Sequence, residues 1–241
     1  MMTFIIPMAG RGSRFVKEGF KIPKYMIEVK DKTLFEYSIE SLPLEVADQI
    51  IFICLEEHEK FNVSTFIKEK INHKNIKIIK LQEVTRGQAE TVYKCKDLVS
   101  ENDEILIYNI DTAFHSTKLM QVLSDNNLKK DGILGAFIDK SPDDKWSFAS
   151  LNENDDVIKT TEKDKISDYA LTGLYHFSRA SDFFDISKDC LENDKTVRGE
   201  FYIAPMYNNL IKRGKKFTID IVDDFIPLGT PQEVRKFESK N

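Results

Sequence analysis

Short runs of apolar residues, uninterrupted by polar ones, set the strongest constraint on how this chain can fold. The clearest is Ile50-Ile51-Phe52-Ile53-Cys54-Leu55, and similar runs lie within residues 4–9 and 104–110. Their length suits strands better than helices, and a strand that is apolar on both faces must be covered on both faces. Stretches with helical spacing separate these runs. The pattern therefore predicts an α/β fold, with a three-layer doubly wound and mostly parallel sheet and helices on each side.

Local signals predict further elements along the chain. Thr33 and Glu36 have the spacing of a capping box at the start of a helix, and residues 76–81 form another strand-like run. The remaining predicted elements are helices from Ser64 and over 87–98, a hairpin over 148–159, a strand over 169–177, a helix over 201–212 that Gly214 ends, a strand over 217–222 and a last helix from Pro231. We expect residues 139–145 and 187–199 to be solvated loops.

The composition limits the class of protein. The chain has 241 residues, 41% of them hydrophobic, which suits one domain over 1–241 better than two small ones. Its formal net charge of −5 argues against general binding of nucleic acid, which needs a basic surface. The chain has no bilayer-length apolar run and no signal-peptide pattern, so we expect a cytoplasmic protein that does not contact membranes. The spacing of its cysteines and histidines makes a zinc site improbable.

A glycine-containing loop follows the first predicted strand directly. It reads Gly10-Arg11-Gly12-Ser13-Arg14, and Lys24 comes shortly after it. Glycines let the backbone approach an anion closely, and Arg and Lys supply charges that suit phosphate. The loop fits neither the dinucleotide fingerprint, whose third glycine position holds Phe15, nor the P-loop. It is therefore either a phosphate-binding loop of another kind or an ordinary tight turn.

Three polar groups follow strands and so fall on the same edge of the predicted sheet. In parallel sheets, ligands bind beyond the carboxyl ends of the strands. Besides the glycine loop, this edge receives the turn over 82–88 and Asp111. A carboxylate opposite a phosphate-binding loop is a natural ligand for Mg²⁺, although Asp also often caps a helix. The Gln82 amide matches the edge of a nucleobase, and Gly87 leaves its backbone open to a ligand. A glutamine in a turn can equally be solvated.

Taken together, these motifs resemble a known family, the sugar-phosphate nucleotidylyltransferases. The family includes glucose-1-phosphate thymidylyltransferases, uridylyltransferases and small cytidylyltransferases. The resemblance covers nearly the whole chain and rests on GRGSRF, PKYMIEV, Gln82 five residues before Gly87, Asn109-Ile110-Asp111, Glu162-Lys163, Thr172-Gly173-Leu174-Tyr175 and Leu228-Gly229-Thr230-Pro231. It implies a nucleotidyltransferase fold of the GT-A-like type with a nucleotide-binding half at 1–115 and an acceptor-binding half at 116–241. It also implies Mg²⁺ as the cofactor.

The resemblance assigns roles by position. The residues expected to bind the nucleoside triphosphate (CTP, UTP or dTTP) are Met8, Ala9, Gly10, Gly12, Ser13, Gln82, Gly87 and Gln88. Those expected to bind a phosphorylated small-molecule acceptor are Asn109, Glu162, Lys163, Gly173 and Glu200. Catalysis would rest on Arg14, Lys24, Asp111 and Lys163. Without the resemblance, Glu162, Lys163 and Glu200 would be interpreted as surface charges.

One position departs from the family. Many of the sugar enzymes carry a second metal-binding acid two residues before the Gly-Thr of the last motif, where this chain has Pro227. Asp223 or Asp224 could substitute, and Asp224 is our predicted second ligand beside Asp111. Alternatively, the metal relies on Asp111, phosphate and water.

The implied reaction joins a pyrimidine nucleoside triphosphate to a sugar 1-phosphate or similar acceptor and releases pyrophosphate, for surface polysaccharide biosynthesis. Three alternatives stay open: a CTP-dependent enzyme that uses a non-sugar phosphorylated acceptor for capsule or lipopolysaccharide decoration, a non-catalytic nucleotide-binding regulatory module, and a glycosyltransferase. The chain lacks the Asp-x-Asp motif usual in the last class. A monomer or a homodimer is expected.

Overall fold

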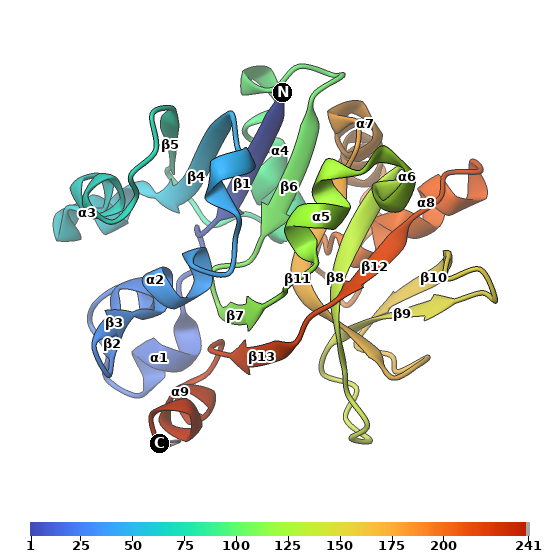
Figure 1. The fold of residues 1–241 in the computed structure, drawn as a ribbon. Helices are drawn as coiled ribbons and strands as arrows, with labels where there is room; N and C mark the ends of the chain where they lie inside the picture. Colours follow the sequence, from blue (N-terminus) through green and yellow to red (C-terminus); the bar gives the residue numbers. More distant parts are fainter. Residues whose placement is uncertain (240–241) are drawn as a thin grey trace.

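The apolar runs form the middle of a large sheet. β1 (Met2–Pro7) pairs in parallel with β4 (Gln49–Leu55) and with β6 (Glu104–Tyr108), and β5 (Ile76–Leu81) continues beyond β4. The computed structural model, which describes residues 1–239, shows these four strands side by side (Figure 1). Every residue of β4 is buried, as expected for a strand covered on both faces.

The second half of the chain extends the same sheet. β11 (Tyr169–Phe177) runs antiparallel beside β6 and joins the two halves. β8 (Gly132–Ile138) pairs with β11, and β12 (Thr218–Ile221) pairs in parallel with β8. The hairpin of β9 (Ser147–Leu151) and β10 (Val157–Glu162) also pairs with β11. Within residues 1–239, one nine-stranded sheet therefore runs through both halves.

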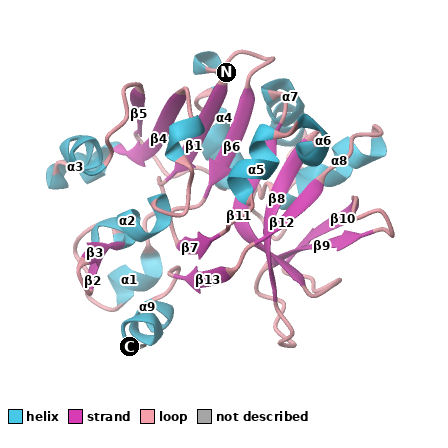
Figure 2. Ribbon diagram, in the orientation of Figure 1, coloured by secondary structure: helices cyan, strands magenta, loops and turns pink. Residues whose placement is uncertain are grey.

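Alternate side chains of the central strands enter two separate cores. Ile5 and Ile51 belong to one core, and their neighbours Phe4 and Phe52 belong to the other. Helices cover both faces of the sheet (Figure 2). The first core contains residues of α4 (Gln88–Tyr93), α7 (Ala180–Glu192) and α8 (Tyr207–Lys212), and the second contains residues of α2 (Leu34–Ile39), α3 (Val63–Lys70) and α5 (Leu119–Ser124). The predicted three-layer α/β fold is confirmed.

Smaller elements surround one end of the sheet. They are α1 (Ser13–Lys17), α9 (Pro231–Glu238), the ribbon of β2 (Glu28–Val29) and β3 (Lys32–Thr33), and the ribbon of β7 (Thr112–His115) and β13 (Asp224–Pro227). The short α6 (Asn126–Lys129) instead lies beside α5. Short 3₁₀ turns cover Lys24–Met26, Leu44–Val46, Glu56–Phe61, Lys96–Leu98 and Ala204–Met206. Among residues 1–239, no helix combines the length and the apolarity that crossing a bilayer requires.

Most local expectations are confirmed. The capping box of Thr33 and Glu36 is present in both directions. The strands over 76–81 and 169–177 have the expected bounds, and the last helix begins at Pro231. The helix expected over 87–98 is shorter, because α4 ends at Tyr93 and only a 3₁₀ turn follows.

Two expectations in the second half are wrong. The solvated loop expected over 187–199 begins inside α7, whose Phe183 and Ile186 are buried in the core. The helix expected over 201–212 begins only at Tyr207, after a 3₁₀ turn that contains Pro205. Phe201 cannot begin this helix, because its N–H donates to Arg86 O and its carbonyl accepts from the N–H of Ala89. A strand also forms at 132–138, a segment for which we predicted no element.

Three ionisable side chains meet at the start of β6, where Lys129 and His176 are buried and Glu104 is partly buried. Lys129 Nζ lies 2.8 Å from both carboxylate oxygens of Glu104, and His176 Nε2 lies 3.1 Å from Glu104 Oε2. Burial lowers the pKa of His176, so the neutral ring donates Nε2–H to Glu104. Burial acts to raise the pKa of Glu104, but the hydrogen bonds from His176 and Lys129 hold it at about 2.

We expect acid to destabilise the fold in two steps. The unfolded chain takes up a proton on His176 below its ordinary pKa of 6.5, whereas the buried ring resists it. The free energy of unfolding should then fall by up to about 1.4 kcal/mol per pH unit below that value. The free energy of unfolding should fall again below pH 4.5, because the unfolded chain then takes up a proton on Glu104 that the folded protein does not bind until about pH 2. Urea unfolding between pH 7.5 and 5 measures the first step.

The variant His176→Gln should flatten the slope between pH 7 and 5. His115→Gln is the matched control, because His115 is exposed. An unchanged slope in His176→Gln would contradict the assignment.

Candidate active site

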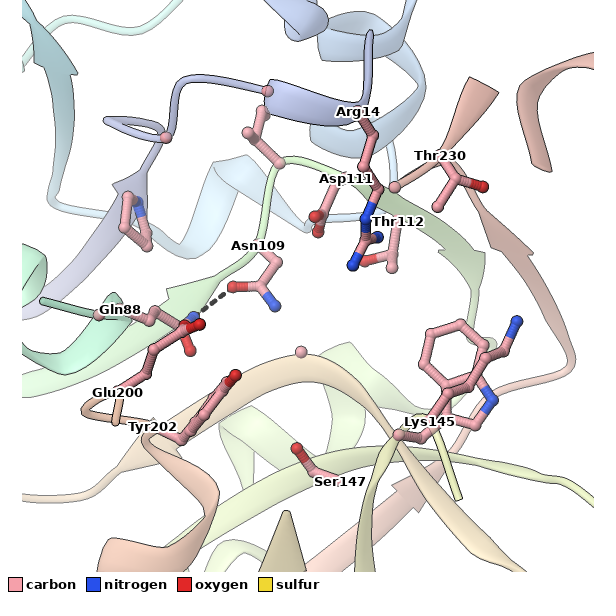
Figure 3. A pocket seen from close by; sticks show the side chains of 18 of the residues that line it. Arg14, Gln88, Asn109, Asp111, Thr112, Lys145, Ser147, Glu200, Tyr202 and Thr230 are labelled. Carbon is pink, nitrogen blue, oxygen red and sulfur yellow. Dashed lines mark hydrogen bonds between the residues drawn. The ribbon is translucent and has the colours of Figure 1, made fainter. Parts of the chain in front are cut away.

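One cavity of about 1420 Å³ opens at the carboxyl ends of β1 and β6. Arg14, Asp111, Gln88 and Asn109 project into it from the N-terminal half, and Ser147, Glu200 and Tyr202 from the C-terminal half (Figure 3). Of the residues predicted from the sequence to form the site, all but two line this cavity. The exceptions are Gln82 and Asp224.

The glycine loop brings Lys24 to the cavity. Gly12 has a left-handed backbone with φ +61°, and a Cβ at this position would lie 3.3 Å from the Cβ of Lys24. The missing side chain therefore makes room for the lysine stem. Phe15 is buried, and its N–H donates to Gly12 O at 2.8 Å, so the loop is anchored to the core.

Lys24 and Asp111 form an ion pair at the centre of the site. Lys24 Nζ lies 2.8 Å from Asp111 Oδ2, and the two side chains are only 16% and 33% exposed. Asp111 follows β6, and its carbonyl accepts from the N–H of Leu228 at 2.9 Å. The pair holds the lysine beside the carboxylate that the sequence predicts to bind metal. A cation thus already lies against Asp111 Oδ2.

The residue after Lys24 fixes its backbone. Tyr25 is buried, and its hydroxyl lies 2.9 Å from Nδ1 of the buried His58. Burial lowers the pKa of His58, so the ring is neutral and its Nδ1 accepts the hydrogen bond from the Tyr25 hydroxyl. This hydrogen bond ties the lysine segment to the 3₁₀ turn that follows β4.

The cavity is more basic than the chain as a whole. The net charge of the chain is −5, but cations outnumber acids among the lining residues. The cations are Arg11, Arg14, Lys24, Arg86, Lys145, Lys163, Arg198 and Lys236, and the acids are Asp111, Asp144, Glu162, Glu200 and Glu233. This local excess of positive charge favours an anionic ligand.

Lys163 is the centre of a second basic group in the C-terminal half. Its backbone has φ +51°, and its N–H donates to Trp146 O at 2.9 Å. Its ammonium donates to the hydroxyl of Tyr202 at 2.7 Å, and its carbonyl accepts from Arg198 Nη2 at 2.7 Å. These contacts orient Lys163 toward the cavity before any ligand arrives.

Glu162 is a buried carboxyl at the wall of the cavity. It is 9% exposed and accepts a short hydrogen bond from the hydroxyl of Ser147. Burial raises the pKa of Glu162. The group is therefore not the surface charge that composition alone suggested, and it can accept from or donate to a hydroxyl of a ligand.

Gly173 allows β11 to pass close to the residues after β6. Its φ is +91°, and a Cβ would lie 2.5 Å from Asn109 Nδ2. The N–H of Asn109 donates to Gly173 O, and the Asn109 side chain accepts from Gln88 (Figure 3). Gln88, which was predicted to bind the nucleotide, is thus linked through Asn109 to Gly173, and the last two were predicted to bind the acceptor.

Two predicted residues lie elsewhere. Gln82 is outside the cavity lining, and its Nε2 donates to Glu56 at 2.5 Å on the exposed surface. Asp224 is exposed at the start of β13 and pairs with His115, whereas Pro227 at the other end of β13 lies opposite Thr112. The extended strand therefore carries Asp224 away from Asp111. Neither side chain is among the residues that line the cavity.

Many lining residues are missing from the sequence-based prediction, and four of them matter for the argument below. They are Arg198, Tyr202, Trp146 and Glu233. A Cβ on Gly229 would lie 3.5 Å from Asp111 Oδ2 and 3.6 Å from Glu233 Oε2, so the two carboxylates converge there. Arg198 and Tyr202 flank the Gly199-Glu200 pair that was considered, so only their immediate context could have indicated them. The sequence carried no signal for Trp146.

The sequence matches the nucleotidyl transferase family over residues 4–219. The structure superimposes on that of a nucleoside-diphosphate-sugar pyrophosphorylase from Vibrio cholerae RC9 with a TM-score of 0.84 and 34% identity, covering 98% of this chain and 100% of the other.

Curated relatives match more distantly. The bifunctional protein GlmU of Methanococcus maripaludis is 25% identical over 237 residues, which cover 97% of this chain and 53% of GlmU. The 2-C-methyl-D-erythritol 4-phosphate cytidylyltransferase of Wigglesworthia glossinidia brevipalpis is 28% identical over 134 residues, 54% of this chain and 53% of the relative. The matched region thus spans about half the length of these relatives.

Gly87 should tolerate no side chain. Its φ is +148°, and a Cβ would lie 2.5 Å from Phe201 N and 2.7 Å from Phe201 O, both of which are hydrogen-bonded to the segment around Gly87. We expect Gly87→Ala to lower the free energy of unfolding by about 3 kcal/mol or more, because backbone strain adds to a clash that no rotamer relieves. Urea denaturation measures it.

Gly214→Ala separates strain from clash. Gly214 also has a positive φ, +84°, but its Cβ would meet no atom within 4 Å. We therefore expect Gly214→Ala to lower the free energy of unfolding by only about 1 to 2 kcal/mol. Equal losses in both variants would contradict the close-approach explanation for Gly87.

Proposed function

We propose that this chain, which belongs to the nucleotidyl transferase family, joins a nucleoside triphosphate to a sugar 1-phosphate or similar phosphorylated acceptor and releases pyrophosphate. One observation carries the proposal: two separate basic groups, around Lys24 and around Lys163, line a single cavity. Two phosphorylated ligands that repel each other need such a pair of groups. The sugar pyrophosphorylase from Vibrio cholerae, similar over its full length, supports a nucleotide sugar as the product.

The reaction is a substitution at phosphorus. An oxygen of the acceptor phosphate forms a bond to the α-phosphorus, and the bond from that phosphorus to the β-phosphate oxygen breaks. The electron pair leaves with pyrophosphate. A phosphate monoester has a second pKa of about 6 and is therefore already ionised at neutral pH. The chain then needs no strong base, and its contribution is to hold the two anions in line and to neutralise charge.

The residues of the cavity divide this work by position. The glycine loop with Arg14 and Lys24 would bind the triphosphate, and Lys163 and Arg198 would bind the acceptor phosphate. The guanidinium of Arg14 lies near Asp111 (Figure 3), and Asp111 is the carboxylate that pairs with Lys24. Once phosphate oxygens replace the Asp111 contact, Lys24 is free to neutralise charge on the reacting phosphate.

The residues present also fit Mg²⁺. Asp111 already lies 2.8 Å from a lysine ammonium, and Glu233 Oε2 points to the same place beside Gly229. Mg²⁺ is bound by one or two carboxylates together with substrate phosphates and water, so these two acids suffice. We propose that Asp111 and Glu233 would hold it. Glu233 would replace the second acid that many of the sugar enzymes carry at the position of Pro227. When bound, the metal would supply positive charge to the phosphate oxygens.

The identity of the base follows less directly. A pyrimidine was expected from Gln82, which does not line the cavity, so base contacts would fall to Gln88 and the backbone over 84–87. The match to a cytidylyltransferase favours CTP as one candidate, in line with the alternative of a non-sugar acceptor. We further propose that the product is a donor for capsule or lipopolysaccharide assembly, on the strength of the family resemblance.

Lys24→Met should abolish most of the activity. We expect turnover to fall by about 100-fold or more, because the variant loses a charge aimed at the reacting phosphate. The assay measures pyrophosphate released from ATP, GTP, CTP, UTP and dTTP, each tested with hexose 1-phosphates and with phosphocholine. Lys21→Met, on an exposed lysine outside the cavity lining, is the control. Wild-type protein that releases no pyrophosphate with any pair would support the regulatory alternative.

Glu233→Gln should weaken metal binding. With a non-hydrolysable nucleoside triphosphate present, we expect the Mn²⁺ dissociation constant, measured by electron paramagnetic resonance, to rise by about tenfold. Glu238→Gln, on the exposed end of the same helix, is the control. If Asp224→Asn weakened Mn²⁺ binding and Glu233→Gln did not, the assignment of Glu233 would be wrong.

A further inference from the structure

Trp146 is the single tryptophan of the sequence and lines the cavity. It lies between β8 and β9, immediately before Ser147. Nothing in the family resemblance or in the proposed reaction gives this side chain a role. A half-buried indole at a binding cavity is a large apolar surface that a ligand can cover.

The indole is held rigidly from behind. Phe137 and Phe225 stack on each other with ring centroids 3.9 Å apart. Trp146 contacts both edge to face, with centroid distances of 5.5 Å and interplanar angles of 86° and 83°. Two rings from different parts of the chain thus fix its orientation. A ligand that packs on Trp146 therefore does not have to order it, which favours binding.

The side chain of Lys145 lies over the indole ring. Lys145 Nζ lies 4.4 Å from the ring centroid, and its ammonium also lies 3.1 Å from Glu233 Oε1. Lys145 is half exposed and itself lines the cavity. A flexible lysine can move aside and expose the ring, whereas Phe137 and Phe225 cannot.

The ring lies next to the groups that would bind the acceptor. The carbonyl of Trp146 accepts from the N–H of Lys163, and Ser147 donates to Glu162. The same short segment therefore combines a cation for phosphate, an apolar face and a buried carboxyl. A pyranose ring offers the matching set, with a C–H face for the indole and hydroxyls for the carboxyl.

We propose that Trp146 is the platform on which the ring of the acceptor stacks, and that it selects a neutral sugar ring over a charged, ring-free headgroup. The inference rests on the proposed function, since it assigns the non-phosphate end of the same acceptor. The excess of cations in the cavity argues against a cationic headgroup such as that of phosphocholine. Stacking removes the apolar C–H face from water while Lys163 holds the phosphate.

Steady-state kinetics test the platform. The substrate is the hexose 1-phosphate that gives the fastest pyrophosphate release among those of glucose, mannose and N-acetylglucosamine. We expect Trp146→Ala to raise the KM for this acceptor by about tenfold or more, with the KM for the nucleotide changed less than about threefold. Trp146→Phe keeps a flat ring and should restore most of the loss.

Inorganic phosphate distinguishes stacking from an indirect effect on Lys163. Phosphate has no ring, so its inhibition constant against the acceptor should be the same in wild type and in Trp146→Ala. If the inhibition constant of phosphate rises together with the KM for the acceptor, Trp146 acts only by positioning Lys163, and the inference is wrong. It is also wrong if Trp146→Ala leaves the acceptor KM unchanged, or if phosphocholine is used faster than every hexose 1-phosphate.

Fluorescence gives a readout that does not depend on turnover. Trp146 is the only source of tryptophan emission, so covering the indole should shift or quench it. We expect a saturable change with the hexose 1-phosphates and none with inorganic phosphate at the same occupancy. A saturable change without pyrophosphate release would leave the platform standing and remove the proposed reaction. Turnover with no change in emission would support the proposed reaction and rule out the platform.

Discussion

The burial of both faces of the central strands determines where chemistry can occur in this molecule. Phe4 and Ile5 enter opposite cores, and all of β4 is inaccessible, so a polar side chain in the middle of the sheet is costly unless a protein partner satisfies its hydrogen bonds. The strand ends are the remaining positions. The glycine loop after β1 and Asp111 after β6 lie there, and the cavity forms between them. The location of the site is thus a consequence of the core.

Cations in the cavity are held by protein partners that a ligand would have to replace. Lys24 contacts Asp111, Lys145 contacts Glu233, and Lys163 contacts the Tyr202 hydroxyl. These contacts keep flexible side chains in place and reduce the entropy lost on binding. They also cost affinity, because each of these contacts must be exchanged for one with the ligand. Only a ligand of high charge density makes that exchange favourable, which suits a triphosphate better than a single carboxylate.

The sequence predicted what depends on neighbouring residues and missed what depends on distant ones. The capping box at Thr33 and the strand over 76–81 are local, and both formed as expected. The placement of Lys24, Asp111 and Lys163 around one cavity followed from motif order and strand ends. By contrast, the register of β13 against β7 removed Asp224 from the site, and a contact with Glu56 holds Gln82 at the surface. Neither contact can be predicted from the residues next to Asp224 or Gln82 in the sequence, because each is made with a distant segment.

The glycines of the site show how one motif can serve two purposes. Gly87 was assigned to the nucleotide because it leaves the backbone open, yet the atoms that would meet its Cβ belong to Phe201. Phe201 is hydrogen-bonded on both sides to the nucleotide-side loop and directly precedes Tyr202, the partner of Lys163. A shift of either loop therefore moves the other. A ligand bound against residues 84–88 and a ligand bound beside Lys163 would therefore change each other's affinity by the same factor, because coupling between two sites is reciprocal.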